Sequence, residues 1–251
     1  MSGRGSPRAV GFDYGRTLVD IGYPAEGLAK AGAELLRMLG VPPPAEIAAD
    51  QVGRAVDTRL DELVARAHAR DPVHEVEIYS LYSRALQATL GLRATPDQLR
   101  RAGDMLQWPW RQAITVDREV GPALTALRRR GVRLGLLSNA PYQPLMMRGM
   151  LAEQGLGDCF DVILFSSEIG VRKPAPGAFT ALLAGLGTNA SETWYVGDEL
   201  EADIEGARAA GMLPLLAPRA GSPERARELG AEVLGSWAEL VTRWDSAGAP
   251  R

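Results

Sequence analysis

Two aspartates stand at the ends of short apolar segments that lie far apart in the chain. Asp13 follows the run Ala-Val-Gly-Phe at 9–12, and Asp198 follows Trp-Tyr-Val-Gly at 194–197. Each run is typical of a buried strand, and the carboxyl ends of parallel strands line the ligand crevice of an α/β sheet. Two carboxylates delivered there can share one divalent cation, and the first can also attack as a nucleophile.

Other polar residues follow two further predicted strands. Ser138 and Asn139 follow the strand expected over 132–137, and Lys173 lies in the loop after the strand expected over 161–165. A hydroxyl, an amine and nearby backbone N–H groups can bind the oxygens of a phosphoryl group. Mg²⁺ held by Asp13, Asp198 and one backbone carbonyl would offset the repulsion between an anionic nucleophile and an anionic substrate.

The second half of the chain supplies the elements that position these groups. After residue 116 the pattern alternates between helices, expected over 120–130, 144–154, 176–186 and 201–210, and strands. The later strands are expected over 193–196 and 213–216, with a weak one over 232–234. Strands that alternate with helices indicate βαβ units, and hence an α/β fold with a Rossmann-like parallel sheet.

Residues 20–115 form a block in which the apolar spacing is helical and no strand is expected. Its helices are expected over 25–39, from about 45, around 76–90, and from Thr95, where Thr95 and Gln98 have the capping-box spacing. The predicted organisation is a core of residues 8–19 and 116–245, an α-helical cap of 20–115, and flexible tails at 1–7 and 246–251.

Composition excludes several classes of function. The 251-residue chain has a formal net charge of −3, which gives no basic footprint for nucleic acid. It lacks an apolar run of the ~20 residues that cross a membrane. A single cysteine, Cys159, fits a reducing cytoplasm. We therefore expect a cytoplasmic protein with a small-molecule substrate, and the sequence leaves its oligomeric state open.

Four separated motifs together resemble the haloacid-dehalogenase-like (HAD) superfamily of hydrolases with a helical cap inserted after motif one. They are Phe12-Asp13-x-x-x-Thr17-Leu18, Leu137-Ser138-Asn139, Arg172-Lys173-Pro174 and Gly197-Asp198-x-x-x-x-Asp203. The resemblance spans roughly residues 8–217. It implies Mg²⁺-dependent hydrolysis of a small phosphorylated metabolite through an aspartyl-phosphate.

The resemblance also implies a role for each motif residue. Asp13 would be the nucleophile, and Asp13, Asp198 and the backbone carbonyl of Gly15 would hold the metal. Ser138 and Lys173 would contact the phosphoryl group, with Asn139 and Thr17 grouped in the same phosphate site. Thr17 would also stabilise the motif-one loop. Asp203 would orient Lys173 or a metal-bound water.

The chain departs from the family next to the nucleophile. Family phosphatases carry a second aspartate two residues after the first, which protonates the leaving group and later activates water, and here that position is Gly15. Arg16 stands where glycine is usual. The backbone carbonyl for the metal is retained, but the acid/base group is lost, and such a loss typically costs ~10²–10⁴-fold in rate.

Four interpretations of Gly15 follow. The leading one is a phosphatase in which a cap group (His68, His74, Glu75, Tyr79 or Tyr82) substitutes for the acid, or whose leaving group needs little protonation. The second is dehalogenase chemistry, although haloacid dehalogenases work without metal. The third resembles phosphonoacetaldehyde hydrolases, with Lys30 as the only cap lysine. The fourth is a binding or regulatory protein without turnover. Retention of all the phosphate- and metal-binding residues favours the first.

Overall fold

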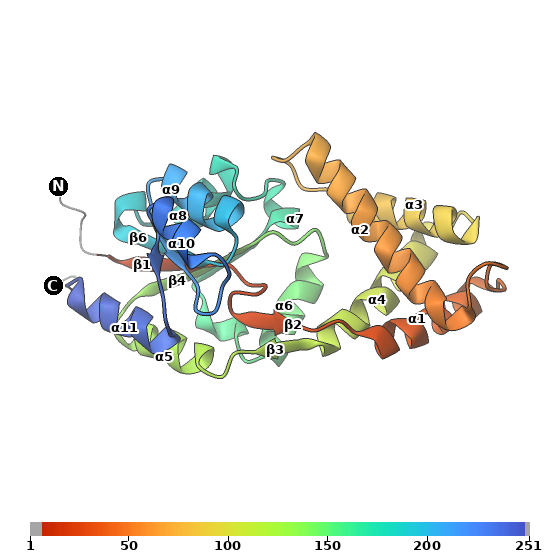
Figure 1. Cartoon of the computed structure of the whole chain (residues 1–251), viewed down its shortest axis with the longest axis horizontal. Coiled ribbons are helices and arrows are strands. Elements are labelled where there is room, and N and C mark those ends of the chain that lie inside the picture. Colours follow the sequence, from red (N-terminus) through yellow and green to blue (C-terminus); the bar gives the residue numbers. More distant parts are fainter. Residues whose placement is uncertain (1–6, 249–251) are drawn as a thin grey trace. The chain divides into compact units, whose positions relative to one another are not determined.

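The computed structural model describes residues 7–248, and the chain divides into two compact units (Figure 1). Among the described residues, the core unit comprises 7–20, 73–75 and 116–248, and the inserted unit comprises 21–72 and 76–115. Of the tails expected at 1–7 and 246–251, residues 1–6 and 249–251 lie outside the described residues. The last helix continues to Ser246, the first residue of the expected C-terminal tail.

The core unit is built on a six-stranded sheet in the order β5-β4-β1-β6-β7-β8, and every pair is parallel. The predicted α/β fold with a Rossmann-like sheet is confirmed. Because β1 lies between β4 and β6, the ends of these three strands meet in the middle of one sheet edge. The strands are β1 (Ala9–Phe12), β4 (Arg133–Ser138), β5 (Val162–Phe165), β6 (Thr193–Gly197), β7 (Leu213–Leu216) and β8 (Glu232–Val233).

Helices cover both faces of this sheet, with α8 and α9 on one side and α5 and α11 on the other (Figure 1). Phe179 of α8 packs edge-on against Tyr195 of β6, and Trp194 packs in the same way against Trp244 of α11. The core helices are α5 (Val120–Arg129), α6 (Pro144–Glu153), α7 (Ser166–Ile169), α8 (Pro176–Leu186), α9 (Gly206–Ala209), α10 (Pro223–Glu228) and α11 (Trp237–Ser246). Short 3₁₀ turns occupy Gly157–Cys159 and Ala190–Glu192.

The inserted unit is helical, with α1 (Ala25–Leu39), α2 (Val52–Arg70), α3 (Ile78–Leu90), α4 (Pro96–Gln112) and a 3₁₀ turn at Ala49–Gln51. Helices α1 and α2 cross closely at two glycines. A Cβ on Gly53 would lie 2.0 Å from the carbonyl oxygen of Leu28, and one on Gly32 would lie 2.2 Å from the nitrogen of Gly53. A larger residue at either position would therefore force the two helices apart.

The capping box predicted at Thr95, the N-cap of α4, is confirmed. The Thr95 hydroxyl accepts from the Gln98 backbone N–H, and the Gln98 side chain accepts from the Thr95 N–H. Two features of the 20–115 block differ from the prediction. A two-stranded ribbon, β2 (Val19–Ile21) with β3 (Ile114–Val116), forms where the chain leaves and rejoins the core. Residues 73–75 belong to the core unit. In both cases the segments are too short to show a periodicity.

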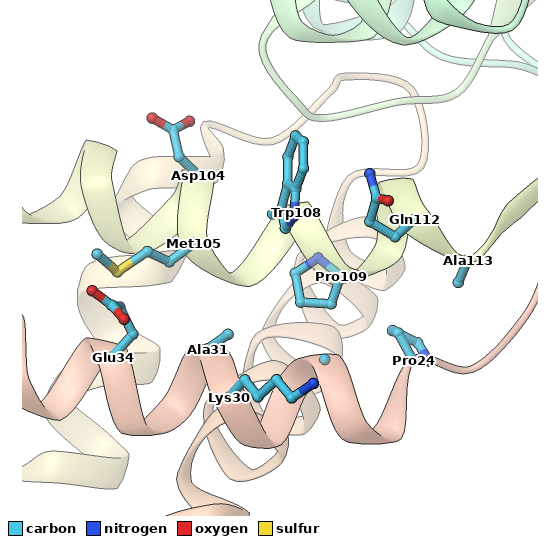
Figure 2. Close-up of a pocket in the computed structure, with 11 residues that line it drawn as sticks. Pro24, Lys30, Ala31, Glu34, Asp104, Met105, Trp108, Pro109, Gln112 and Ala113 are labelled. Carbon is cyan, nitrogen blue, oxygen red and sulfur yellow. The ribbon is translucent and has the colours of Figure 1, made fainter.

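A groove of about 710 Å³ lies between α1 and α4 of the inserted unit. Lys30 and Glu34 line it from α1, and Asp104, Met105 and Trp108 line it from α4 (Figure 2). Lys30 is exposed, whereas an amine that forms a Schiff base is usually desolvated. Its surroundings therefore disfavour the interpretation that makes Lys30 a Schiff-base residue.

Asp57 of α2 is a buried carboxyl whose partner is the Trp110 indole, which donates to Oδ1 at 3.0 Å. Burial raises the pKa of Asp57 to about 6, and the bond from Trp110 only partly opposes that shift. Because the pKa of Asp57 is higher in the folded state than in the unfolded state, the folded protein is favoured by protonation of this carboxyl. That contribution to the free energy of unfolding is fully present below the unfolded pKa near 4 and is lost as the pH rises through the folded pKa of about 6.

Asp57→Asn keeps the acceptor for Trp110 and removes the buried charge. At pH 8 we expect the free energy of unfolding of the variant to exceed that of the wild type by on the order of 1–2 kcal/mol, a value reduced to allow for partial solvent screening of Asp57. Below pH 4 the two should have the same free energy of unfolding. Urea titrations at both pH values measure this, and an advantage that does not shrink toward acid pH would contradict it.

Candidate active site

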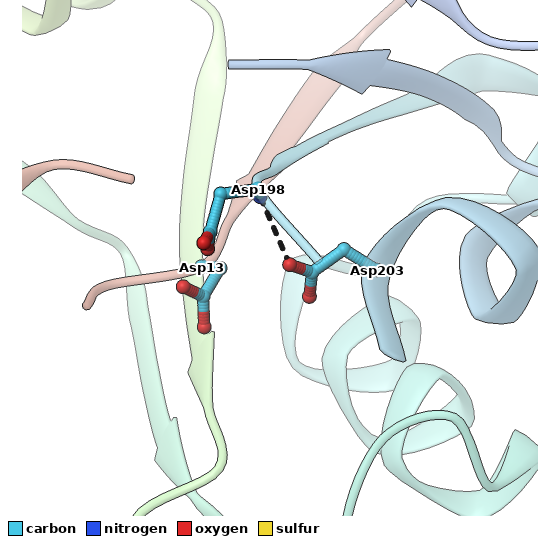
Figure 3. Close-up of side chains that lie close together, drawn as sticks. All are labelled: Asp13, Asp198 and Asp203. Atoms are coloured by element: carbon cyan, nitrogen blue, oxygen red, sulfur yellow. Dashed lines mark hydrogen bonds between the residues drawn. The ribbon is translucent and has the colours of Figure 1, made fainter. Parts of the chain in front are cut away.

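The predicted nucleophile and the predicted metal ligand lie side by side. Asp13 follows β1, its N–H donates to the Val196 carbonyl of β6 at 2.9 Å, and Asp198 follows β6 directly. The carboxylates of Asp13 and Asp198 face the same space, with Asp203 beside them (Figure 3). Oxygen atoms from these three residues all lie within 4.8 Å of one another. The sheet order thus brings together acids that are 185 positions apart (198 − 13).

The Lys173 side chain contacts three other residues of the site. Its ammonium donates to Asp13 Oδ1 at 2.6 Å, to Asp203 Oδ1 at 2.6 Å and to the Tyr195 hydroxyl at 2.9 Å. The side chain is 2% exposed. Burial alone would lower the pKa of Lys173, but attraction to the two carboxylates outweighs it and holds that pKa well above its usual range. The group is therefore a fixed cation in contact with Asp13.

Both carboxylate oxygens of Asp203 accept hydrogen bonds from other residues of the protein. Asp203 lies in a π-helical segment, Leu200–Glu205, where Oδ2 accepts from the backbone N–H of Asp198 at 3.0 Å (Figure 3). The same oxygen accepts from the backbone N–H of Glu199, also at 3.0 Å. The approach is close enough to require glycine at 197, because a Cβ there would lie 2.3 Å from Asp203 Cγ. Asp203 thus contacts both Lys173 and the loop that carries Asp198, and each of its carboxylate oxygens already has a hydrogen-bond partner.

The charge balance fits a divalent cation at Asp13 and Asp198. Burial raises the pKa of Asp13 to about 7, opposed by Lys173 and reinforced by the charge of Asp203. Burial and then the charge of Asp203 raise the pKa of Asp198 to about 6. In both residues burial is the largest cause, so the ionised form of each carboxylate is poorly solvated. Carboxylate oxygens are the donors that hard divalent cations prefer.

The remaining predicted residues of motifs one and two adopt distinct roles. The Thr17 hydroxyl donates to Asp198 Oδ1 at 3.1 Å, so Thr17 joins the motif-one loop to the predicted metal ligand. Ser138 is buried at the end of β4, next to β1. The Asn139 amide donates to the Lys173 carbonyl at 2.9 Å and accepts from the Lys173 N–H at 2.8 Å. Any contact of Asn139 with phosphate would therefore come from its backbone.

Among the proposed acid/base substitutes, His74 and Glu75 lie in the core unit, while His68, Tyr79 and Tyr82 lie in the inserted unit. Tyr82 is buried, and its hydroxyl accepts from Gln107 at 2.7 Å, so its contacts are those of a packed residue. Tyr195 is a site residue that motif reasoning missed. Its hydroxyl donates to the Leu137 carbonyl at 3.0 Å and accepts from Lys173. The available signal was a tyrosine in a fully buried strand, whose hydroxyl needs a polar partner.

The loop after Asp13 turns sharply. The Leu18 N–H donates to the Tyr14 carbonyl at 2.9 Å, and Gly15 forms a single β-bridge with Val19. Arg16, at the tip, has φ +59°, a left-handed conformation that disfavours a side chain. Glycine, the residue that the motif resemblance leads one to expect here, adopts this conformation without strain.

Arg16→Gly should raise the free energy of unfolding by up to about 1 kcal/mol, since the left-handed strain of about 1–2 kcal/mol is offset in part by the greater chain entropy of glycine. Arg16→Ala retains the strain and should leave stability close to the wild type. Thermal or urea unfolding of the pair measures the difference. Equal stabilities of the two variants would mean that the backbone at Arg16 is not strained.

Comparison with known proteins places this site in a family. The chain matches the haloacid dehalogenase-like hydrolase family over residues 8–211. It is 31% identical over 248 residues to a phosphoglycolate phosphatase of Rhodospirillum rubrum, covering 98% of this chain and 92% of that protein. It is 32% identical over 178 residues to a ribulose-1,5-bisphosphate 5-phosphatase of Halopiger xanaduensis, covering 66% and 73%.

A solved structure shows the same fold. The 2-haloacid dehalogenase of Pseudomonas syringae pv. Tomato superposes with a TM-score of 0.68 over 95% of this chain and 99% of that one, at 24% sequence identity. At this identity the likeness concerns architecture alone. The family match, by contrast, spans residues 8–211, the range in which all four motifs lie. The chain therefore belongs to the haloacid dehalogenase-like hydrolase family, and the protein is a hydrolase.

Proposed function

We propose that the protein is a Mg²⁺-dependent phosphatase that acts on a small phosphorylated metabolite through an aspartyl-phosphate on Asp13. The observation that carries the proposal is the contact of Lys173 with Asp13 at 2.6 Å, next to Asp198. This arrangement offers a nucleophilic oxygen, a cation for a phosphoryl oxygen and a second carboxylate for the metal. Two of its relatives are named as phosphatases of small metabolites, which supports the same class of substrate.

In this proposal Asp13 attacks phosphorus in line with the ester oxygen that leaves. A P–O bond to the carboxylate forms, the bond to the leaving group breaks, and the electron pair departs with that oxygen. Lys173 and Ser138 stabilise the charge that develops on the phosphoryl oxygens. Bound at Asp13, Asp198 and the Gly15 carbonyl, Mg²⁺ would neutralise phosphate charge. The oxygen of a water molecule then bonds to phosphorus, the P–O bond to Asp13 breaks with its electron pair returning to the carboxylate, and the proton lost by the water passes to solvent.

The reaction needs two proton transfers, one to the leaving oxygen and one from the attacking water, and the aspartate that serves both in family phosphatases is absent here. With Gly15 in its place, the leaving oxygen takes its proton from solvent, from the substrate or from a group of the inserted unit. The attacking water likewise lacks a base at position 15. We infer a slow enzyme that favours leaving groups of low pKa. Opening and closing of the inserted unit as a cap would admit the substrate and exclude bulk water.

Membrane and nucleic-acid partners have no part in the proposal. Among the helices of residues 7–248, none is both long and apolar enough to cross a membrane. The net charge of −3 offers no attraction to a phosphate backbone. A cytoplasmic location is proposed from the single cysteine and the metabolite substrate.

The test is phosphate release by purified protein with Mg²⁺. The panel should contain an aryl phosphate, which needs little protonation of its leaving group, together with phosphoglycolate, ribulose 1,5-bisphosphate and other small phosphate esters. We expect turnover that stops when the metal is chelated and returns when Mg²⁺ is added. Absence of phosphate release from every ester would reject the phosphatase and favour a binding or regulatory protein on the same fold.

A further inference from the structure

The segment Val73–Glu75 connects α2 to α3 of the inserted unit along the chain, yet it is part of the core unit. It pairs with the stretch that leads into Lys173. The Arg172 N–H donates to the Val73 carbonyl at 2.9 Å, and the Glu75 N–H donates to the Gly170 carbonyl at 3.1 Å. His74 forms an antiparallel bridge with Val171. The backbone just before Lys173 is therefore held by residues from another part of the sequence.

The Glu75 side chain makes a second connection, to the end of β4. The Ser166 hydroxyl donates to Glu75 Oε2 at 2.5 Å and accepts from the Ala140 N–H at 2.8 Å. Ser166 is 0% exposed, so its hydroxyl depends on these two partners. A buried hydroxyl that loses its acceptor is destabilised, because water cannot replace the missing bond.

These contacts close a ring. Glu75 joins Ser166 and Gly170, Ser166 joins Ala140, and Asn139, which precedes Ala140, holds the Lys173 backbone through both ends of its amide. The ring links the loop of motif two to the loop of motif three. Small displacements in either loop would move the Lys173 ammonium relative to Asp13.

We propose that Glu75 is a positioning residue for Lys173, acting through Ser166 and through the pairing of Val73–Glu75 with residues 170–172. This inference rests on the proposed function, in which Lys173 must meet a phosphoryl oxygen. It gives Glu75 an indirect role and does not make it the substitute for the acid missing at Gly15. Residues 72 and 76, on either side of this segment in the sequence, belong to the inserted unit.

The activity test compares Glu75→Ala, Glu75→Gln and Ser166→Ala. Misplacement of a catalytic group by about 1 Å can cost ~10²-fold, so we expect Glu75→Ala and Ser166→Ala each to lower kcat by ~10–100-fold. Glutamine keeps the acceptor for Ser166 and should stay within ~3-fold of the wild type, since the hydrogen bond rather than the charge does the positioning. The double variant Glu75→Ala/Ser166→Ala should be little worse than either single one, because both break the same connection.

Glu77→Gln is the matched control. Glu77 lies two residues along, is exposed, and its carboxylate accepts from the N–H groups of Tyr79 and Ser80 at the start of α3. We expect it to leave kcat unchanged. Wild-type kcat in Glu75→Ala would overturn the proposal. So would a Glu75→Gln variant as impaired as Glu75→Ala, because the carboxylate would then act by its charge.

Hydrogen exchange provides a readout that needs no substrate. The backbone amides of Arg172 and of residue 75 should exchange at least ~10-fold faster in Glu75→Ala than in the wild type, and should stay protected in Glu75→Gln. If the wild type hydrolyses no phosphate ester, the proposed function fails, and this exchange measurement still decides whether Glu75 holds the Lys173 loop. Unchanged exchange of the Arg172 amide in Glu75→Ala would overturn the positioning role.

Discussion

Replacing Asp13 by asparagine should lower phosphate release by at least ~10⁴-fold, because an amide oxygen is a poor nucleophile and cannot form the aspartyl-phosphate. Asparagine has nearly the same shape as aspartate, and its amide oxygen can still accept the bond that Lys173 donates to Asp13. We therefore expect a folded but inactive protein. Initial rates of phosphate release with an aryl phosphate measure the loss, and circular dichroism confirms the fold.

Asp20→Asn serves as the control for the Asp13 variant. Asp20 lies in β2, close in sequence, and is exposed. Its substitution should leave the rate within about 3-fold of the wild type, as exposed side chains away from a site usually have small effects. Residual activity in Asp13→Asn of more than a few per cent would mean that another group attacks phosphorus.

Restoring the family's acid with Gly15→Asp should raise phosphatase turnover by ~10²-fold, at the lower end of the range for general acid–base catalysis. The new carboxyl would protonate the leaving oxygen and then activate the water that releases phosphate. The gain should be larger for alkyl phosphates than for aryl phosphates, because only the former need a proton on the leaving group. Steady-state kcat with one ester of each kind measures both effects.

Gly15→Asn is the matched variant for this experiment. It introduces a side chain of the same size without a titratable proton, so it separates acid/base chemistry from any steric effect in the loop. We expect no gain with asparagine. Equal effects of aspartate and asparagine, or a lower rate with aspartate, would indicate a site built for other chemistry.

Three of the four motifs could be placed because each lies where a short apolar run ends at a polar residue. Asp13 and Asp198 directly follow β1 and β6, Ser138 is the last residue of β4, and parallel strands bring these ends to one edge of the sheet. Lys173 lies farther along the chain, beyond β5 and α7. The capping box at Thr95 could also be predicted, since it depends on two residues three positions apart. Features set by residues close together in the sequence can be predicted from their spacing.

Features that depend on long-range contacts could not be derived in this way. Nothing in the residue type of Asn139 distinguishes an amide that binds phosphate from one that holds the Lys173 backbone. The same holds for Thr17, whose hydroxyl meets Asp198 across 181 positions. The assignment of residues 73–75 to the core unit could not be predicted, because three residues between two helices are too few to show a periodic pattern.

The central claim is that Asp13 becomes covalently phosphorylated and that Gly15 leaves the second step slow. Rapid acid quenching during turnover of an aryl phosphate, followed by mass spectrometry of the peptide that contains Asp13, tests it most directly. We predict a phosphoryl group on Asp13 in a large fraction of the wild-type enzyme, a much smaller fraction in Gly15→Asp and none in Asp13→Asn. Steady release of phosphate with an unmodified Asp13 peptide throughout would contradict the account.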